Sequence, residues 1–205
     1  MSAEDLLGKL NVSRETIDRL KVFESTIRKW NPKINLVSRS SLEDLWTRHF
    51  VDSIQVFRCA TPPDHWVDIG SGGGFPGVVV AILAADESPQ TRVTLIESDQ
   101  RKSAFLRTVA RECGAKVEVI SKRIEAADPQ NADVLSARAL ADLSILLEFT
   151  ERHLKPGGVS LFPKGVTWKK EVDNARERWR FDLEPITSLT EPDAVVLKIK
   201  GVARV

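Results

Sequence analysis

The sequence predicts an α/β fold, in which helices cover both faces of a mostly parallel sheet and a helical extension precedes it. Three observations lead to this fold class. From residue 61 onward, short apolar runs alternate with runs of helical periodicity, which is the pattern of βαβ units. One strand-to-helix connection, residues 70–77, is rich in glycine. Residues 1–60 show helical periodicity alone.

The extension, residues 1–60, contains two predicted helices. In the first, residues 13–30, apolar side chains recur at helical spacing. Asn31-Pro32 is expected to end this helix, because proline disfavours helical backbone at the residue before it. Ser41-x-x-Asp44 resembles a capping box and predicts the start of the second helix. The turn at residues 61–64 marks the predicted boundary with a second compact unit, residues 61–205.

The second unit alternates strands and helices and ends differently. Strands are expected at 65–69, 92–97, 117–121, 133–137 and 159–163, and helices at 76–85, 100–113, 141–154 and 167–179. Lys155-Pro156-Gly157-Gly158 predicts a tight turn before the fifth strand. Two final strands, 181–189 and 194–200, follow each other as a hairpin. The expected sheet therefore has seven strands, one of them antiparallel.

Composition narrows the class of protein. The chain has 205 residues and a net charge of +1, and it contains no run of 18 apolar residues, so no membrane span is expected. The polar N-terminus does not resemble a signal peptide. Cys59 and Cys113 are far apart without a Cys-x-x-Cys motif, which predicts a cytoplasmic setting without a zinc site or disulfide framework.

Positive charge is concentrated in two segments. Residues 101–123 carry seven Lys or Arg against two acids, and residues 164–180 carry six against three. Such segments are typical either of a phosphate-facing surface or of a solvated helix face. Charge alone leaves nucleic-acid binding open.

The glycine-rich turn is the clearest candidate for a ligand site. An apolar strand ends at Ile69, the turn follows, and Pro76 opens an apolar helix. Free N–H groups and the positive end of the helix dipole then face a ligand on the turn. Gly72-x-Gly74-x-x-Gly77 matches the dinucleotide fingerprint. Asp68-x-Gly70-x-Gly72-x-Gly74 resembles the first motif of S-adenosylmethionine (SAM) methyltransferases, and this second match explains more residues.

Other candidate site residues follow the ends of the later strands, where open α/β sheets bind ligands. Glu97, at the end of the second strand, is placed to accept hydrogen bonds from ribose hydroxyls. Ile124 and Glu125 follow the third strand and could hold adenine. Arg138 ends the fourth strand and Lys164 the fifth, and both would line the substrate side.

A histidine in the extension allows two interpretations. His49 lies on an apolar helical face beside Arg48 and Asp52. It is either a hydrogen-bonded boundary histidine or a catalytic base, and the sequence favours neither.

Several blocks together resemble the bacterial small-subunit ribosomal RNA guanine-N7 methyltransferases, also called the glucose-inhibited division protein B family. These blocks are Asn35-Leu36-Val37-Ser38, Arg48-His49-Phe50-Val51-Asp52-Ser53, Asp68 to Gly77, Ser136-Ala137-Arg138-Ala139 and Lys164-Gly165. The resemblance implies a class I SAM-dependent methyltransferase with a seven-strand, Rossmann-like sheet. The cofactor contacts that we expect are Asp68, Gly70, Gly72, Gly74, Phe75, Glu97, Ile124, Glu125 and Arg138.

The implied reaction is methylation of N7 of a specific guanine in 16S (small-subunit) ribosomal RNA. We expect substrate contacts at Asn35, Arg48, His49, Arg123 and Lys164. We expect Lys164 and Arg138 to be the catalytic residues. Lys164 would donate to guanine O6 or to a phosphate, and Arg138 would lie on the cofactor side. The expected partner is the small ribosomal subunit, with no metal ion, no membrane and a monomeric enzyme.

Two other functions remain open at this point. The overlapping fingerprint at Gly72–Gly77 is compatible with an NAD(P)-dependent oxidoreductase. A non-enzymatic RNA-binding or ribosome-assembly protein on a relict SAM fold would also carry these motifs.

Overall fold

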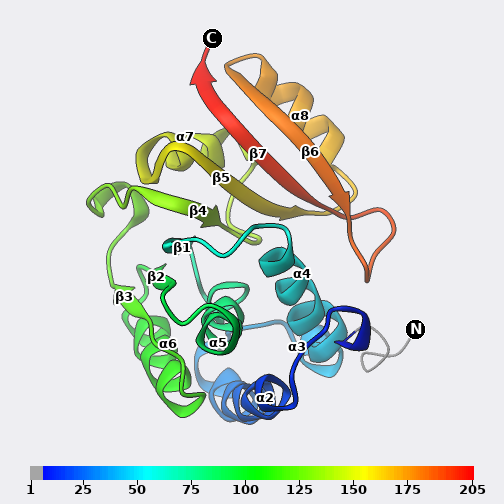
Figure 1. Ribbon diagram of the computed structural model, residues 1–205, viewed down its shortest axis with the longest axis vertical. Coiled ribbons are helices and arrows are strands. Elements are labelled where there is room, and N and C mark those ends of the chain that lie inside the picture. Colours follow the sequence, from blue (N-terminus) through cyan, green and yellow to red (C-terminus); the bar gives the residue numbers. More distant parts are fainter. Residues whose placement is uncertain (1–6) are drawn as a thin grey trace.

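The computed structural model describes residues 7–205, and within them a seven-stranded sheet has the order β3-β2-β1-β4-β5-β7-β6 (Figure 1). The strands are β1 (His65–Ile69), β2 (Arg92–Ile96), β3 (Glu118–Ile120), β4 (Ala132–Ser136), β5 (Leu154–Lys164), β6 (Trp179–Thr187) and β7 (Val195–Arg204). Strands β1 to β5 pair in parallel, and β7 runs antiparallel between β5 and β6. The predicted seven-strand sheet with one antiparallel strand is confirmed.

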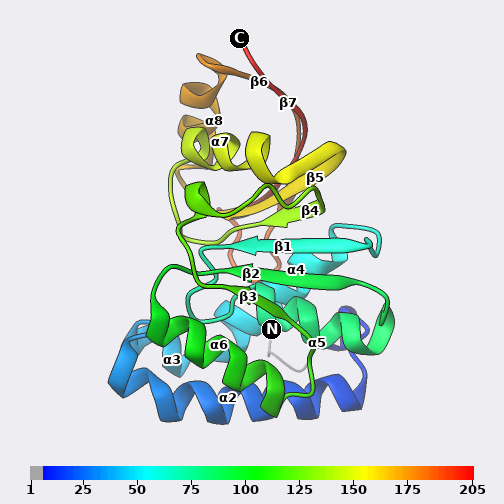
Figure 2. The same ribbon diagram turned by 90° about the vertical axis from the view of Figure 1, so that its left-hand side faces the viewer.

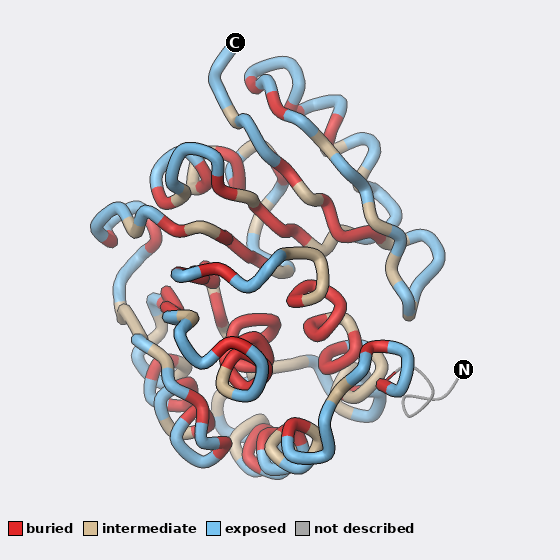
Figure 3. Tube along the Cα trace, in the orientation of Figure 1, coloured by how far each residue is buried: buried red, intermediate tan, exposed pale blue. Residues whose placement is uncertain are grey.

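Helices cover both faces of the sheet, as the alternation predicts (Figure 2). One face packs against α2 (Arg14–Ile34), α4 (Asp52–Arg58), α5 (Gly77–Glu87) and α6 (Gln100–Glu112), and the other against α7 (Leu143–His153) and α8 (Trp168–Arg176). Successive strand residues alternate between the two cores, with Trp66 in the first and Val67 in the second, because side chains along a strand point to opposite faces. The buried residues lie mainly in the strands and in the helices that pack against them (Figure 3).

The first predicted helix is longer than expected. Helix α2 continues through Pro32 to Ile34 and ends at Asn35, whose φ is 49°. The expected end at Asn31-Pro32 is wrong, since a proline in the last turn removes just one intrahelical bond. The Asn31 side chain completes the end: its Oδ1 accepts from the N–H groups of Leu36 and Val37 at 2.7 and 2.9 Å.

The second predicted helix is divided. Ser38, and not Ser41, caps α3 (Arg39–Glu43), because its Oγ accepts from the backbone N–H of Ser41 at 3.1 Å. The capping box expected at Ser41-x-x-Asp44 is therefore wrong. A π-helical segment, η1 (Trp46–Val51), then leads directly into α4.

The tight turn expected at 155–158 lies within a strand. Strand β5 begins at Leu154, and its pairing with β4 shifts register between Ala132 and Val134. Gly157, with φ of 80°, accommodates the irregularity. A bulged strand start and a turn share glycine-rich sequence, which explains the error.

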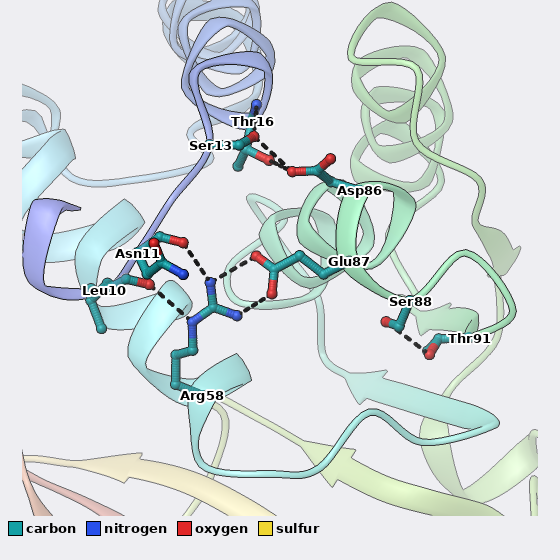
Figure 4. Close-up of polar contacts among 9 residues, drawn as sticks. All are labelled: Leu10, Asn11, Ser13, Thr16, Arg58, Asp86, Glu87, Ser88 and Thr91. Atoms are coloured by element: carbon teal, nitrogen blue, oxygen red, sulfur yellow. Dashed lines mark hydrogen bonds and ion pairs between the residues drawn. The ribbon is translucent and has the colours of Figure 1, made fainter.

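The N-terminal helices share one core with the sheet. Leu20, Phe23 and Ile27 of α2 are fully buried in the same cluster as Trp66 of β1. At the far end of α5, Arg58 joins the carboxylate of Glu87 to the carbonyls of Leu10 and Asn11 (Figure 4). The extension thus forms one wall of the packed molecule.

Within residues 7–205, no helix is both long and apolar enough to cross a membrane. The same residues contain no group of three or more His, Cys, Asp or Glu side chains arranged to hold a metal ion.

Candidate functional site

A cavity of about 400 Å³ lies at the carboxyl ends of β1 to β4. This size falls within the roughly 300–1,000 Å³ typical of small-molecule sites. Its walls come from the turns after the four strands, and they include Gly70, Gly72, Phe75, Glu97, Arg123, Ile124, Glu125 and Arg138. The structure therefore brings together most of the residues that the sequence predicts for the cofactor.

Glu97 connects the glycine turn to β2. Its Oε2 accepts from the N–H of Gly72 at 2.8 Å, and its Oε1 accepts from the N–H of Asp99 at 2.8 Å. The side chain is 8% exposed and lines the cavity. Each carboxylate oxygen has two lone pairs, so both retain one for a further donor.

At Gly72, no side chain of the described residues covers the main chain of the glycine turn on the side that faces the cavity. Its φ is 48°, and a Cβ built there would have just one close neighbour, the carbonyl oxygen of Gly70 at 3.7 Å. This backbone angle favours glycine, because side-chain-bearing residues rarely adopt it. A ligand can consequently approach the main chain at this point.

Asp68 and Gly77 lie beneath the turn, outside the cavity lining. A Cβ on Gly77 would stand 2.6 Å from Asp68 Oδ2, so this glycine permits close packing of α5 on β1. Asp68 Oδ1 accepts from Ser136 Oγ at 2.6 Å, and burial raises the pKa of the carboxyl to about 6. In this position Asp68 joins β1 to β4 and supports the turn. Gly74 also lies outside the lining, against Phe23 and Val78.

Four side chains form a stacked column beside the cavity, here called the Phe23 column: Phe23, Phe75, His49 and Arg138. The rings of Phe23 and Phe75 stack with centroids 4.9 Å apart, and those of His49 and Phe75 lie 4.7 Å apart. The Arg138 guanidinium lies 5.1 Å from the Phe75 ring centroid. The Phe23 column thus connects α2, the glycine turn and the end of β4 through stacked side chains.

Arg138 is held by the extension. Its guanidinium donates to the carbonyl of Arg48 at 3.1 Å and to Nδ1 of His49. Burial lowers the Arg138 pKa to about 10, and the carboxylates of Asp52 and Asp68 oppose that shift. Arg138 therefore remains a cation at neutral pH.

His49 is kept neutral. It is 8% exposed, and burial, followed by the charges of Arg138 and Arg48, lowers its pKa to about 3. Since a guanidinium can only donate, Nδ1 accepts and the ring proton lies on Nε2. Nε2 is buried and has no hydrogen-bond partner among the described residues.

Lys164 lies outside this cavity. Its Nζ donates to the carbonyl of Ala141 and to Oε2 of Glu171, both at 2.7 Å, and its side chain is 10% exposed. The same Glu171 oxygen accepts from the N–H of Leu143 at 3.1 Å. These contacts order the start of α7, while the expected substrate contact of Lys164 stays a prediction.

The other four residues predicted to contact the substrate lie in three different places around the first cavity. Arg123 lines the cavity, whereas Asn35 is exposed at the end of α2 next to two lining residues, Leu36 and Val37. Arg48 and His49 line a second cavity, which also contains Arg138.

Sequence reasoning missed several lining residues. Lys102 and Lys122 add positive charge to the cavity, and Leu36, Val37 and Leu140 add apolar wall. The sequence did carry signals for four of them: Leu36 and Val37 belong to the block Asn35–Ser38, and Lys102 and Lys122 to the basic segment 101–123. Nothing local to Leu140 indicates its place over Gly70, where its Cδ1 would stand 2.6 Å from an added Cβ.

The chain was compared with known families and proteins. A family model described as GidB, rRNA small subunit methyltransferase G, matches residues 16–195. A ribosomal RNA small subunit methyltransferase G from Ruegeria sp. is 67% identical over 96% of both chains, and one from Cereibacter sphaeroides is 50% identical over 100% of both.

Solved structures share the fold at low sequence identity. An O-methyltransferase from Bacillus cereus, in complex with SAH, has a TM-score of 0.60 at 15% identity, covering 97% of this chain and 96% of that one. A TehB-like SAM-dependent methyltransferase from Corynebacterium glutamicum has a TM-score of 0.59 at 13% identity, covering 87% and 97%. The class I SAM-dependent methyltransferase fold is confirmed. With its sequence matched along most of its length and its cavity at the expected strand ends, the chain belongs to the GidB family, the rRNA small subunit methyltransferases G.

Proposed function

We propose that this chain transfers a methyl group to N7 of a guanine in small-subunit ribosomal RNA, with SAM bound in the glycine-turn cavity. The observation that carries the proposal is the position of that cavity. In this cavity, the main chain at Gly72 is open to a ligand and the Glu97 carboxylate lies beside it, at the ends of adjacent parallel strands. The chain that carries this cavity belongs to the GidB family.

The residues present fit the cofactor. Glu97 retains acceptor capacity for ribose hydroxyls, and the main chain at Gly72 is open to a close approach. We assign the adenine contact to Ile124 and Glu125, which follow β3 and line the cavity. When bound, SAM supplies an electrophilic methyl group on a sulfonium.

Methyl transfer to N7 requires mainly that the protein position the two reactants. Guanine N7 is an acceptor in the plane of the ring and carries no proton, so no general base is required. Holding two reactants in line is worth roughly 7–11 kcal/mol. The neutral His49, whose Nδ1 already accepts from Arg138, is suited to holding Arg138 in place between the two cavities.

The substrate side follows from the charge at the cavity rim. Lys102, Lys122 and Arg123 line the first cavity, and Arg48 lines the second. We assign these cations to phosphate contacts. Lys164, which orders the start of α7 through Glu171, is also proposed to donate to guanine O6 or to a phosphate. We further propose that the enzyme acts in the cytoplasm as a monomer.

Nucleoside mass spectrometry tests the proposed reaction. Small-subunit rRNA from cells lacking the gene should lose one 7-methylguanosine, and purified enzyme with SAM should restore it on isolated subunits. No change in 7-methylguanosine, or a methyl group on another atom, would refute the proposal.

Calorimetry tests the cofactor site separately. Glu97→Ala should weaken SAM binding by about 1–3 kcal/mol, the range for hydrogen bonds to a charged group. Glu118→Ala, an exposed acid on the neighbouring strand, is the matched control. Equal affinities for the two variants would remove Glu97 from the site.

A further inference from the structure

A second cavity, about 510 Å³ in volume, adjoins the first and shares Arg138 and Ala139 with it. Its walls come from η1 and the start of α4 on one side and from the β6–β7 connection, residues 188–194, on the other. Two adjoining cavities that share part of their lining are the arrangement that a two-substrate transfer needs.

The walls of this second cavity are built by specific hydrogen bonds. Gln55 of α4 donates to the carbonyl of Thr187 at 2.8 Å and accepts from the N–H of Leu189 at 3.0 Å. Arg48 lies 3.5 Å from the Glu191 carboxylate. These contacts hold residues 188–194 against α4, so the cavity has two fixed sides.

Asp52 is the best-placed side chain in this cavity to read a base. Its Oδ1 accepts from Thr190 Oγ1, while its Oδ2 has no hydrogen-bond partner among the described residues. Burial raises the pKa of Asp52, and the Thr190 bond together with Arg138 and Arg48 opposes the shift. His49, also lining the cavity, contributes a neutral ring whose Nε2 has no partner.

A carboxylate in this place matches guanine and not adenine. The Watson–Crick edge of guanine presents two donors, N1–H and the 2-amino group, whereas adenine presents an acceptor at N1. Enzymes that modify a base commonly bind it flipped out and read this edge. N7 lies on the opposite edge of the ring and would face the shared Arg138 boundary.

The charge of the cavity also suits the product. Asp44, Asp52 and Glu191 line it together with Arg48 and Arg138, so acids outnumber cations by one, and methylation at N7 converts guanine to a cation. Fixed negative charge near developing positive charge stabilises the transition state.

We propose that the second cavity binds the target guanine and that Asp52 accepts from its N1–H and 2-amino groups, leaving N7 toward the first cavity. This inference rests on the proposed N7 methylation and adds the residue that selects the base.

Two assays on the full-length enzyme test this role. Asp52→Asn should lower the single-turnover rate of methylation of unmethylated small subunits by roughly ten- to a hundredfold, as expected for a lost charged hydrogen bond. Its SAM affinity should stay within about twofold of wild type, since Asp52 does not line the first cavity. By NMR titration of the SAH-loaded enzyme, wild type should bind 7-methylguanosine more tightly than guanosine, and Asp52→Asn should lose that preference.

Two further variants separate recognition from structure. Asp193→Asn removes an exposed acid from the same connection and should leave both assays unchanged. Thr190→Val removes the hydrogen bond to Asp52 and keeps the carboxylate, so the preference for 7-methylguanosine should persist.

The outcomes distinguish this inference from the proposed reaction. Full turnover and an intact 7-methylguanosine preference in Asp52→Asn would overturn the guanine site while leaving N7 methylation standing. A loss of the preference in Thr190→Val equal to that in Asp52→Asn would reduce Asp52 to a structural residue. Absence of 7-methylguanosine formation by wild type would refute the reaction itself.

Discussion

At His49, the surrounding residues determine the protonation state of a single ring. Arg138 occupies Nδ1 and Phe75 covers one face, so a second proton would be added beside a guanidinium in a buried place. The pKa of about 3 follows from this burial and charge. His49 is therefore neutral throughout the physiological range and acts as an acceptor for Arg138.

The pH dependence of stability follows with a definite sign. Below pH 6.5 the unfolded chain protonates His49 while the folded chain does not until about pH 3, so the free energy of unfolding falls as the pH drops through this window. At pH 5 the loss amounts to about 2 kcal/mol at most, given about 1.4 kcal/mol per pKa unit. In His49→Asn, which keeps an acceptor for Arg138, denaturant titrations should show a smaller loss between pH 8 and pH 5 than in wild type. Parallel curves for the two proteins would contradict the low pKa.

At the scale of elements, the end of α7 holds the segment predicted to bind adenine. The guanidinium of Arg152 donates twice to the carbonyl of Ala127, at 3.2 and 2.7 Å. The fully buried His153 donates from Nε2 to the carbonyl of Ile124 at 3.0 Å. The short 3₁₀ helix η2 (Ile124–Ala126) is thereby attached to α7, which lies on the opposite face of the sheet from α5.

Arg152→Met should loosen this segment while leaving the fold intact. The side chain keeps its apolar stem and loses both hydrogen bonds, so SAM affinity should fall by roughly three- to tenfold, about 1 kcal/mol for such bonds. Hydrogen exchange of residues 122–127 should accelerate. Arg204→Met breaks an exposed ion pair with the adjacent Glu151 and provides the control. An unchanged SAM affinity in Arg152→Met would show that α7 does not position the segment.

At the scale of the whole molecule, the N-terminal helix is part of the site. Phe23 of α2 is fully buried, stacks on Phe75 in the glycine turn and lies 3.0 Å from where a Cβ of Gly74 would stand. Through the Phe23 column, packing of the extension against the sheet also sets the position of Arg138. Stability and ligand binding should therefore change together when this packing is disturbed.

Phe23→Ala tests this coupling against a matched substitution. Both Phe23 and Phe57 are buried in the same core, and either alanine variant should lose about 3–5 kcal/mol of unfolding free energy. Phe57 stacks on Trp66 of β1, away from the turn. Calorimetry on folded protein should show weaker SAM binding in Phe23→Ala and unchanged binding in Phe57→Ala. Equal SAM affinities would confine Phe23 to a purely structural role.

The sequence by itself determined the order of elements and the glycine turn. Strand β1 and the start of α5 agree with prediction within a residue, because alternation, helical periodicity and glycine spacing are local properties of the chain. The same reasoning placed Glu97, Ile124, Glu125 and Arg138 at strand ends. Since parallel strands end at one edge of the sheet, these residues had to converge on one cavity.

Tertiary structure alone decided which charges are paired and which side chains are free. Lys164 is paired with Glu171 seven residues further along the chain, and no periodicity indicates that the two meet across the turn before α8. Asp52 meets Thr190, 138 residues away, because the β6–β7 connection folds back over α4. Asp68 has the motif position of a ligand contact yet lies beneath the turn, bonded to Ser136. Such contacts depend on how crossovers pack, and that packing is a property of the whole core and not of any local segment.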